Sequence, residues 1–372
     1  MNIQLLYILL SFVISLSCGL VFIPAIVSFC KRKNLYDIPN ARKVHKNQVP
    51  RLGGVCFAPC MMLAMILALA VFNSNYTSHQ VTLNLWSLYF CISLLLIYAV
   101  GLIDDLIGLD AKIKFFVQIL SASLLPMAGL YINNLYGFCG LHEIPYAVGF
   151  PLTVFVLVFV DNAINLIDGI DGLSAGLSFI ALTGFLLCFA ADGIWVYCIL
   201  IIGLMGVLLA FMYFNLFGKA GKNKIFMGDS GSLTIGFILG FLFIKFVMDC
   251  PYVHVFSYGN IVLAISLLIV PIFDVCRVIC VRLMHKQPIF KADKNHMHHK
   301  LMRSGLTQHQ SLVYMIAAAL LFIGFNSVLN LFCDINLVVL SDIVLWMLMH
   351  LEINHRIRKQ GKTVFLPADS QE

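Results

Sequence analysis

The chain has 372 residues, of which 61% are hydrophobic and only 11% are Asp, Glu, Lys or Arg. Soluble domains contain about 45–50% apolar and about 25% charged residues, so the composition excludes a soluble enzyme, a disordered chain and a coiled-coil rod. A net charge of +6 in so apolar a chain does not indicate nucleic-acid binding, and we expect the lipid bilayer as solvent.

Eleven runs of apolar residues are long enough to cross a bilayer, which takes about 20 residues per helix. They predict an all-α polytopic membrane protein with about eleven transmembrane helices. The predicted spans are 4–30, 52–72, 82–103, 113–132, 148–167, 173–191, 194–216, 231–249, 260–283, 311–332 and 335–352. We predict one integral membrane catalytic domain over 1–352 and a basic cytoplasmic tail over 353–372.

Basic residues gather on one side of these spans. The loops predicted to lie outside are 73–81, 133–147, 192–193, 250–259 and 333–334, and they contain no Lys or Arg. Because basic residues favour the cytoplasmic side, this predicts an N-terminus outside and a C-terminus in the cytoplasm, in a cell inner membrane. Lys245 is the exception, and we expect its ammonium to extend to the outer headgroups.

Acidic residues at span ends are costly and need a reason. Asp104 and Asp105 end the third span. Adjacent carboxylates ionise together only near a cation, and on a helix they point about 100° apart, so that one can face a ligand and the other a neighbouring group. Lys114 supplies a nearby cation that suits an anionic substrate. The alternative is a solvated turn.

Four oxygen-bearing side chains follow at intervals of three where the fifth span ends. They are Asn162, Asn165, Asp168 and Asp171. Gly169 and Gly172 predict an opened turn whose backbone approaches a ligand closely. Oxygen ligands suit Mg²⁺, which takes one or two carboxylates together with phosphate oxygens; a polar helix cap is the alternative.

Two further polar segments lie on the same predicted face. Asp229 opens the eighth span in GDSGS, either as a helix cap or beside a phosphate at the helix N-terminus. The loop KADKNHMHHKLMRSG carries His296, His298 and His299 among cations that include Arg303. Such a loop favours a diphosphate over zinc; simple loop structure is the third interpretation.

The motifs in this order resemble the polyprenyl-phosphate N-acetylhexosamine-1-phosphate transferases. The matching segments are Asp104-Asp105, NAINLIDGIDGL from Asn162, MGDSGSL from Met227, HMHH from His296, and the opening loop from Asp37 to Gly54. The HMHH form and the short spacing from Asp105 to Lys114 are most similar to the undecaprenyl-phosphate N-acetylglucosamine-1-phosphate transferase branch. The phospho-MurNAc-pentapeptide translocase branch of the same family is the alternative.

The resemblance implies a reaction that initiates cell-surface glycan synthesis. A polyprenyl phosphate oxygen attacks the sugar-proximal phosphorus of a UDP-N-acetylhexosamine and releases UMP, with Mg²⁺ as cofactor and Mn²⁺ as a substitute. By resemblance the catalytic residues are Asp104, Asp105, Asp168, Asp171 and His298; the substrate-binding residues are Lys114, Asn162, Asn165, His296, His299 and Arg303; the metal ligands are Asp229 and Asn165.

Two other classes of function stay open. A secondary transporter of an anionic solute also places charges in its spans, but near the midplane, and a membrane scaffold would bind lipid or nucleotide without catalysis. The Gly236-xxx-Gly240 spacing suits helix contacts either in a homodimer or within one subunit. The sugar defaults to N-acetylglucosamine by branch, and polyprenol length is left undetermined.

Overall fold

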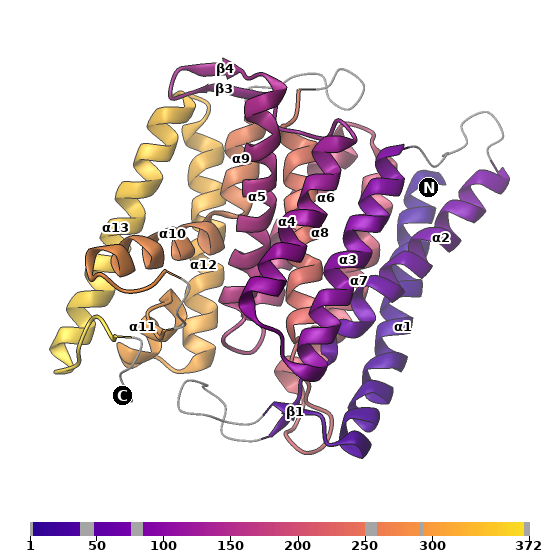
Figure 1. Ribbon diagram of the computed structural model, residues 1–372, viewed down its shortest axis with the longest axis horizontal. Helices are drawn as coiled ribbons and strands as arrows, with labels where there is room; N and C mark the ends of the chain where they lie inside the picture. Colours follow the sequence, from indigo (N-terminus) through magenta and orange to yellow (C-terminus); the bar gives the residue numbers. More distant parts are fainter. Residues whose placement is uncertain (1–2, 38–47, 76–84, 250–258, 290–292, 368–372) are drawn as a thin grey trace.

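The structure, a computed structural model, describes residues 3–37, 48–75, 85–249, 259–289 and 293–367 (Figure 1). The longer helices are α1 (Ile3–Lys33), α2 (Phe57–Asn75), α3 (Leu85–Ile107), α4 (Ala111–Met127), α5 (Tyr146–Ile167), α6 (Leu173–Ala191), α7 (Trp195–Phe217), α8 (Asp229–Val247), α10 (Ile269–Met284), α12 (Gln308–Leu329) and α13 (Ile335–Lys359). The short helices are η1 (Gly53–Cys56), α9 (Gly259–Leu267) and α11 (Met297–Arg303). Strand β1 (Tyr36–Asp37) pairs with β2 (Val49–Pro50), and β3 (Asn134–Phe138) pairs with β4 (Leu141–Glu143), each in an antiparallel hairpin.

Within the described residues, nine helices are long and apolar enough to cross a membrane, and a bent pair makes up to ten. The protein is therefore a polytopic, helical membrane protein. Helix α4 overlaps the predicted fourth span, which ran five residues further to 132, and its 17 residues are at the lower limit for crossing a bilayer. The predicted orientation stays a prediction.

The ninth predicted span is not one straight helix. It divides into α9 and α10, whose axes bend by 73° (Figure 1). Pro271 lies in the first turn of α10. Its ring nitrogen has no hydrogen to donate to the carbonyl of Leu267, four residues earlier, so the α9 hydrogen-bond pattern cannot continue through this point.

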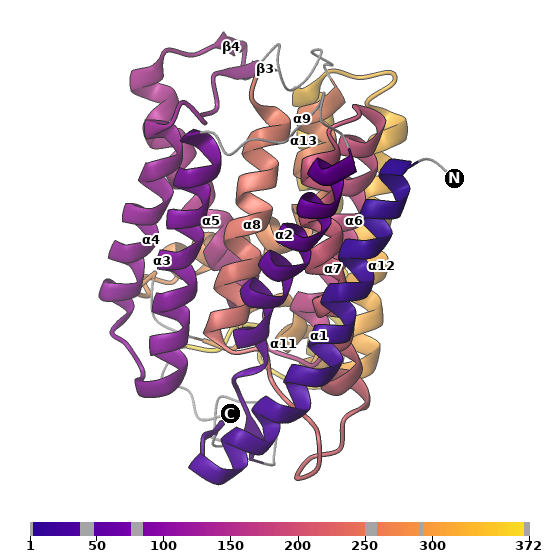
Figure 2. The ribbon, with the colours of Figure 1, turned by 90° about the vertical axis from the view of Figure 1, so that its right-hand side faces the viewer.

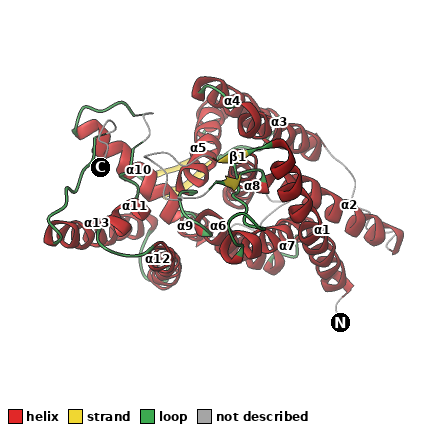
Figure 3. Ribbon diagram, turned by 90° about the horizontal axis from the view of Figure 1, so that it is seen from below, coloured by secondary structure: helices red, strands yellow, loops and turns green. Residues whose placement is uncertain are grey.

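Helix α8 is the centre of the bundle. Its membrane-spanning residues are all buried, and the other helices surround it when the molecule is viewed from below (Figure 3). Gly236 lets α5 approach, since a β-carbon there would lie 2.7 Å from the α-carbon of Asp161. Gly240 likewise faces Leu157 of α5. The Gly236-xxx-Gly240 motif is thus used inside one subunit.

The expectation for Lys245 is wrong. Its side chain is fully buried, and its ammonium lies 3.7 Å from the ring centroid of Trp86 and 5.6 Å from that of Tyr197. Aromatic faces attract a desolvated cation, and this attraction replaces the predicted contact with lipid headgroups.

The polar segments singled out in the sequence lie at one end of the bundle. The C-terminal ends of α3 and α5 meet the N-terminal end of α8 there, and α11 lies at the same end beside α12 and α13 (Figures 1 and 2). Chain direction alone produces this arrangement, because α8 runs antiparallel to both α3 and α5. Polar residues that are distant in sequence therefore meet.

Candidate active site

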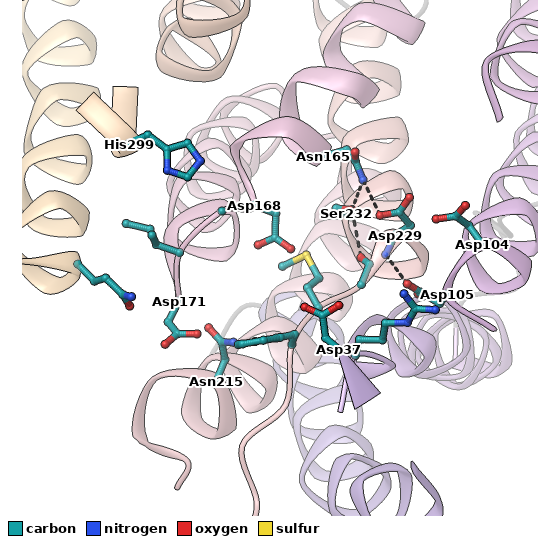
Figure 4. A pocket seen from close by; sticks show the side chains of 17 residues that line it. Asp37, Asp104, Asp105, Asn165, Asp168, Asp171, Asn215, Asp229, Ser232 and His299 are labelled. Atoms are coloured by element: carbon teal, nitrogen blue, oxygen red, sulfur yellow. Dashed lines mark hydrogen bonds between the residues drawn. The ribbon is translucent and has the colours of Figure 1, made fainter. Parts of the chain in front are cut away.

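A cavity of about 390 Å³ opens at this end of the bundle (Figure 4). It lies within the size range of small-molecule sites, about 300–1,000 Å³. Seven predicted site residues line it: Asp104, Asp105, Asn165, Asp168, Asp171, Asp229 and His299. The structure thus brings the four sequence motifs to one pocket.

Asp105 caps helix α8 from a different helix. Its carboxylate accepts hydrogen bonds from the backbone N–H groups of Asp229, at 2.8 Å, and Ser230, at 2.9 Å. Gly228 precedes them with φ +75°, and a β-carbon there would collide with the Arg51 carbonyl and the Asp105 carboxylate. Asp105 is only 4% exposed, so its main contact is this helix end.

Asp104 points elsewhere and joins a charged cluster. The Nζ of Lys114, on α4, lies 2.8 Å from Asp229 Oδ2 and 3.2 Å from Asp104 Oδ2. We call Asp104, Asp105, Asp229 and Lys114 the acidic hub. One cation thus lies between two carboxylates that would otherwise repel each other.

Asn165 completes the surroundings of Asp229. Its amide donates to Asp229 Oδ1, at 3.2 Å, and to the hydroxyl of Ser232, at 2.8 Å (Figure 4). An amide carries both donors and an acceptor, so a rotated Asn165 would present oxygen to a cation beside Asp229.

The predicted opened turn is present between α5 and α6. Helix α5 ends at Ile167, and Gly172 has φ +74° at the start of α6. Asn215 anchors the turn, because its side chain accepts from Gly172 N, at 2.7 Å, and donates to the carbonyl of Ile225, at 2.9 Å. Asp171 forms an ion pair of 2.6 Å with Lys224.

Asp168 faces the pocket from this turn. Burial raises its pKa to about 7, and the negative charges of Asp229, Asp171 and Asp105 add to the increase. A carboxyl group in this state changes charge near neutral pH. A bound cation would return the pKa toward its ordinary range.

The histidines come from α11 and have separate surroundings. His296 Nδ1 lies 2.9 Å from the buried carboxylate of Asp274, which also accepts from Met297 N at 2.8 Å. His298 is 1% exposed and packs against Gly169, where a β-carbon would overlap its ring. His299 lines the pocket.

The surroundings of His298 and His299 favour the neutral form of both imidazoles. Burial lowers the pKa of His299 to about 4, and it lowers the pKa of His298 well below its usual range. The other histidines of the loop add to both effects. A phosphate nearby would raise these values, because an anion favours the charged imidazolium.

Several predicted residues lie outside the pocket lining. Lys114 contacts the lining carboxylates, whereas Asn162 donates to Gln118 at 3.0 Å. Arg303 donates to the carbonyls of Thr363 and Val364. His296 and His298 are not among the lining residues; the centroid of the His298 ring lies 4.1 Å from that of His299 and 6.1 Å from that of His296.

Other lining residues received no role from the sequence. They include Asp37, Arg51, Asn215, Phe226, Ser232 and Gln308. Asp37 and Arg51 lie in the opening loop of the resemblance, and Ser232 lies in its MGDSGSL segment. The sequence feature that could have identified Asn215 is a polar amide near the end of the apolar span 194–216.

The residues fit a magnesium ion without forming a closed cage. Across the described part of the chain, no three His, Cys, Asp or Glu side chains make a metal-binding group. Mg²⁺ needs only one or two carboxylates when phosphate oxygens and water complete its shell. Asp229 and the amide oxygen of a rotated Asn165 provide such a donor set, and the Lys114 ammonium, 2.8 Å from Asp229 Oδ2, shows that this carboxylate attracts a cation.

Comparison with known proteins decides the family. The model of glycosyl transferase family 4 matches residues 85–247. A probable undecaprenyl-phosphate N-acetylglucosaminyl 1-phosphate transferase of Bacillus subtilis is 31% identical over 92% of this chain and 88% of its own length. The chain belongs to glycosyl transferase family 4.

Two more distant relatives agree with this assignment. The undecaprenyl-phosphate alpha-N-acetylglucosaminyl 1-phosphate transferase of Yersinia pestis is 30% identical, covering 77% of this chain and 75% of its own. The enzyme of the same name from Escherichia coli K12 is 29% identical, covering 78% and 76%. The resemblance inferred from the motifs is confirmed at the level of the family, and the family 4 match includes both the acidic hub and the opened turn.

Proposed function

We propose that this protein transfers N-acetylhexosamine 1-phosphate, with N-acetylglucosamine as the sugar, from a UDP-sugar to polyprenyl phosphate and releases UMP. The observation that carries the proposal is the acidic hub, in which Lys114 bridges Asp104 and Asp229 beside a pocket of about 390 Å³. The names of the three relatives support N-acetylglucosamine 1-phosphate as the transferred group and undecaprenyl phosphate as the acceptor.

The proposed step is a displacement at phosphorus. An oxygen of the lipid phosphate bonds to the sugar-proximal phosphorus of the UDP-sugar, and the bond from that phosphorus to the bridging oxygen breaks. The electron pair leaves with UMP. A phosphate monoester is largely dianionic at neutral pH, so positioning and electrostatic stabilisation contribute more than a strong base.

The chain's own residues divide this work. Lys114 brings positive charge toward the two anionic reactants, while Asp105 fixes the backbone on which Asp229 stands. Asp104 is the carboxylate of the pair that faces Lys114 and the pocket and would orient the lipid phosphate, because Asp105 is engaged with the end of α8. His299 and Asp168 face the remaining space, where the diphosphate and the nucleotide would lie.

A magnesium ion held by Asp229 and Asn165 would supply positive charge to the diphosphate oxygens. The donor chemistry supports this choice, since both are hard oxygen ligands. Manganese would substitute at the same ligands.

The proposed topology puts the pocket on the cytoplasmic side of the inner membrane, where nucleotide sugars are made. Its support is the sorting of basic residues, which leaves the outer loops without Lys or Arg. A transporter would need polar groups that can be reached from both sides near the midplane, whereas this pocket is confined to one end of the bundle.

UMP release is the test. Purified protein in lipid nanodiscs, with undecaprenyl phosphate and Mg²⁺, would be given a panel of UDP-sugars, and UMP and the lipid product would be measured. We expect UDP-N-acetylglucosamine to react fastest and Asp229→Asn to be inactive at the same Mg²⁺ concentration. Preference for UDP-MurNAc-pentapeptide would place the chain in the translocase branch, and absence of UMP from every donor would overturn the proposal.

A further inference from the structure

The C-terminal segment turns back onto the loop that carries the histidines. Helix α13 ends at Lys359, and the chain reverses at Gly361, which has φ +67°. Lys362 N donates to Ile357 O, at 3.2 Å, and Gly361 N donates to Arg358 O, at 2.9 Å. These bonds form a Schellman motif, the glycine-dependent stop that sets the direction in which a chain leaves a helix.

We call residues 360–366 the strap and residues 293–305 the His loop, and we infer that the strap positions the His loop for the proposed reaction. The sequence predicted this segment as part of a basic cytoplasmic tail. In the structure Leu366 is buried at 7% exposure, and the segment is hydrogen-bonded to the His loop. This inference rests on the proposed function only for its catalytic consequence.

Asn295 makes the central contact between strap and loop. Its side chain donates to Leu366 O, at 2.8 Å, and accepts from Leu366 N, at 3.0 Å. The side-chain amide thus pairs with one backbone residue as a neighbouring strand would. Asn295 is 2% exposed and immediately precedes His296, so the contact fixes the start of α11.

The other end of α11 is held by a second set of bonds. Arg303 donates to the carbonyls of Thr363, at 3.2 Å, and Val364, at 3.0 Å. Gln360 donates to Ser304 O at 2.6 Å. Both ends of a seven-residue helix are therefore attached to the strap, and a helix of that length has little stability of its own.

A third contact joins the strap to α10. The ring of Phe365 stacks on His285 with centroids 3.9 Å apart. Helix α10 carries Asp274, the carboxylate that holds His296 and Met297. The strap thus joins the end of α10 and the C-terminus of α13 to α11, the helix that carries His299.

A matched pair of truncations tests this inference. Ending the chain after Lys362 removes the partners of Arg303 and Asn295, whereas ending it after Pro367 keeps every strap contact described above. In the shorter variant we expect trypsin to cut after Lys300 and Arg303 at least tenfold faster than in the parent. The longer variant should match the parent, because Lys300 is only 4% exposed there.

Kinetics separate positioning from simple stability. We expect the shorter variant to lower kcat/KM for UMP release about tenfold, mainly through a higher KM for the UDP-sugar, with an unchanged KM for polyprenyl phosphate. Its thermal midpoint should stay that of the parent, since the strap lies outside the spanning helices. Asn295→Ala should have a smaller effect in the same direction in the full chain and none in the shorter variant, because the truncation has already removed Leu366, the partner of the Asn295 side chain.

The possible outcomes are distinct. Unchanged trypsin cutting in the shorter variant would overturn the strap's role, and so would additive effects of truncation and Asn295→Ala. If the parent itself releases no UMP, the proposed function fails. Trypsin cutting, together with binding of UDP-N-acetylglucosamine measured by calorimetry, would then still decide whether the strap holds the loop.

Discussion

The acidic hub and the His loop supply polar groups to the same pocket, but the molecule holds them by different means. The hub stands on the ends of long helices that pack around α8, and the bonds of Asp105 go to backbone atoms. The His loop stands on seven residues of α11 and is attached by side chains, through Asp274 from α10 and Arg303 to the strap.

Because of this difference, we expect substitutions in the two regions to affect stability and substrate binding differently. The helix packing that forms the bundle also positions the hub, so loss of the Asp105 cap should destabilise the fold. The His loop can open locally while the helix bundle stays folded, so substitutions in the loop should weaken substrate binding before they lower the stability of the bundle. Local opening at low free energy is expected where few buried apolar contacts hold a segment.

Breaking the cap of α8 should have the largest effect. Asp105→Ala removes two hydrogen bonds from a buried carboxylate, each worth about 1.5–3 kcal/mol. We expect the free energy of unfolding to fall by about 3 kcal/mol or more and UMP release to be lost, as measured by thermal denaturation and product assay. Asp110→Ala is the matched control, because exposed Asp110 caps α4 through Lys112 N and should cost only about 1 kcal/mol.

The bridging cation should matter for rate more than for folding. Lys114→Met leaves Asp104 and Asp229 facing each other without a cation, and we expect UMP release to fall by about 10²–10³-fold. Residual activity should need less Mg²⁺ than in the parent, because the carboxylates then attract the ion more strongly, whereas Asp229→Asn should need more. Lys112→Met is the control, because Lys112 is exposed and lies two residues earlier; it should change neither the rate of UMP release nor the Mg²⁺ requirement. Equal Mg²⁺ titrations for all variants would contradict the assignment of Asp229 as a Mg²⁺ ligand beside Lys114.

The His loop touches the opened turn at Gly169, beside the pocket that it shares with the hub, so the energy of this contact can be measured. Gly169→Ala would press a methyl group into the ring of His298, and overpacking of this kind costs about 1–3 kcal/mol. We expect reduced thermal stability that His298→Ala restores in the double variant, while UMP release is not restored. Gly324→Ala is the control, because a β-carbon at Gly324 meets no atom within 4 Å; additivity of the two substitutions would show that the contact carries no energy.

Much of the bundle and the gathering of the pocket residues could be predicted from the sequence. Apolar run lengths give the spans directly, and the expected turn after α5 follows from Gly169 and Gly172. The break at Leu268 was missed although the sequence carried its signal: Pro271 lies in the interior of the predicted span 260–283, where a proline removes a backbone hydrogen bond and breaks or kinks a helix.

Other features depend on contacts between distant segments, and local pattern cannot supply these. Nothing near Asp105 in the sequence indicates that its partners are the amides of residues 229 and 230. Lys245 looked like a lipid-facing cation because Trp86 and Tyr197 belong to other helices. Arg303 was assigned to substrate because its backbone partners lie 60 and 61 residues away.

The smallest expected effect is that of acid pH, and it distinguishes most clearly between the stability of the His loop and that of the hub. His298 and His299 have folded pKa values below their unfolded value of about 6.5, and that of His299 is about 4. The unfolded loop therefore binds more protons than the folded loop between these values, so its stability is present above pH 6.5 and is lost as the pH falls toward 4. His299 alone should remove on the order of 2 kcal/mol of local stability at pH 5. Hydrogen-exchange protection of the α11 amides should therefore fall at acid pH, and it should fall less in His299→Gln. The amides of α8 should keep their protection. Equal losses in α8 and α11 would mean that the His loop does not open independently of the bundle.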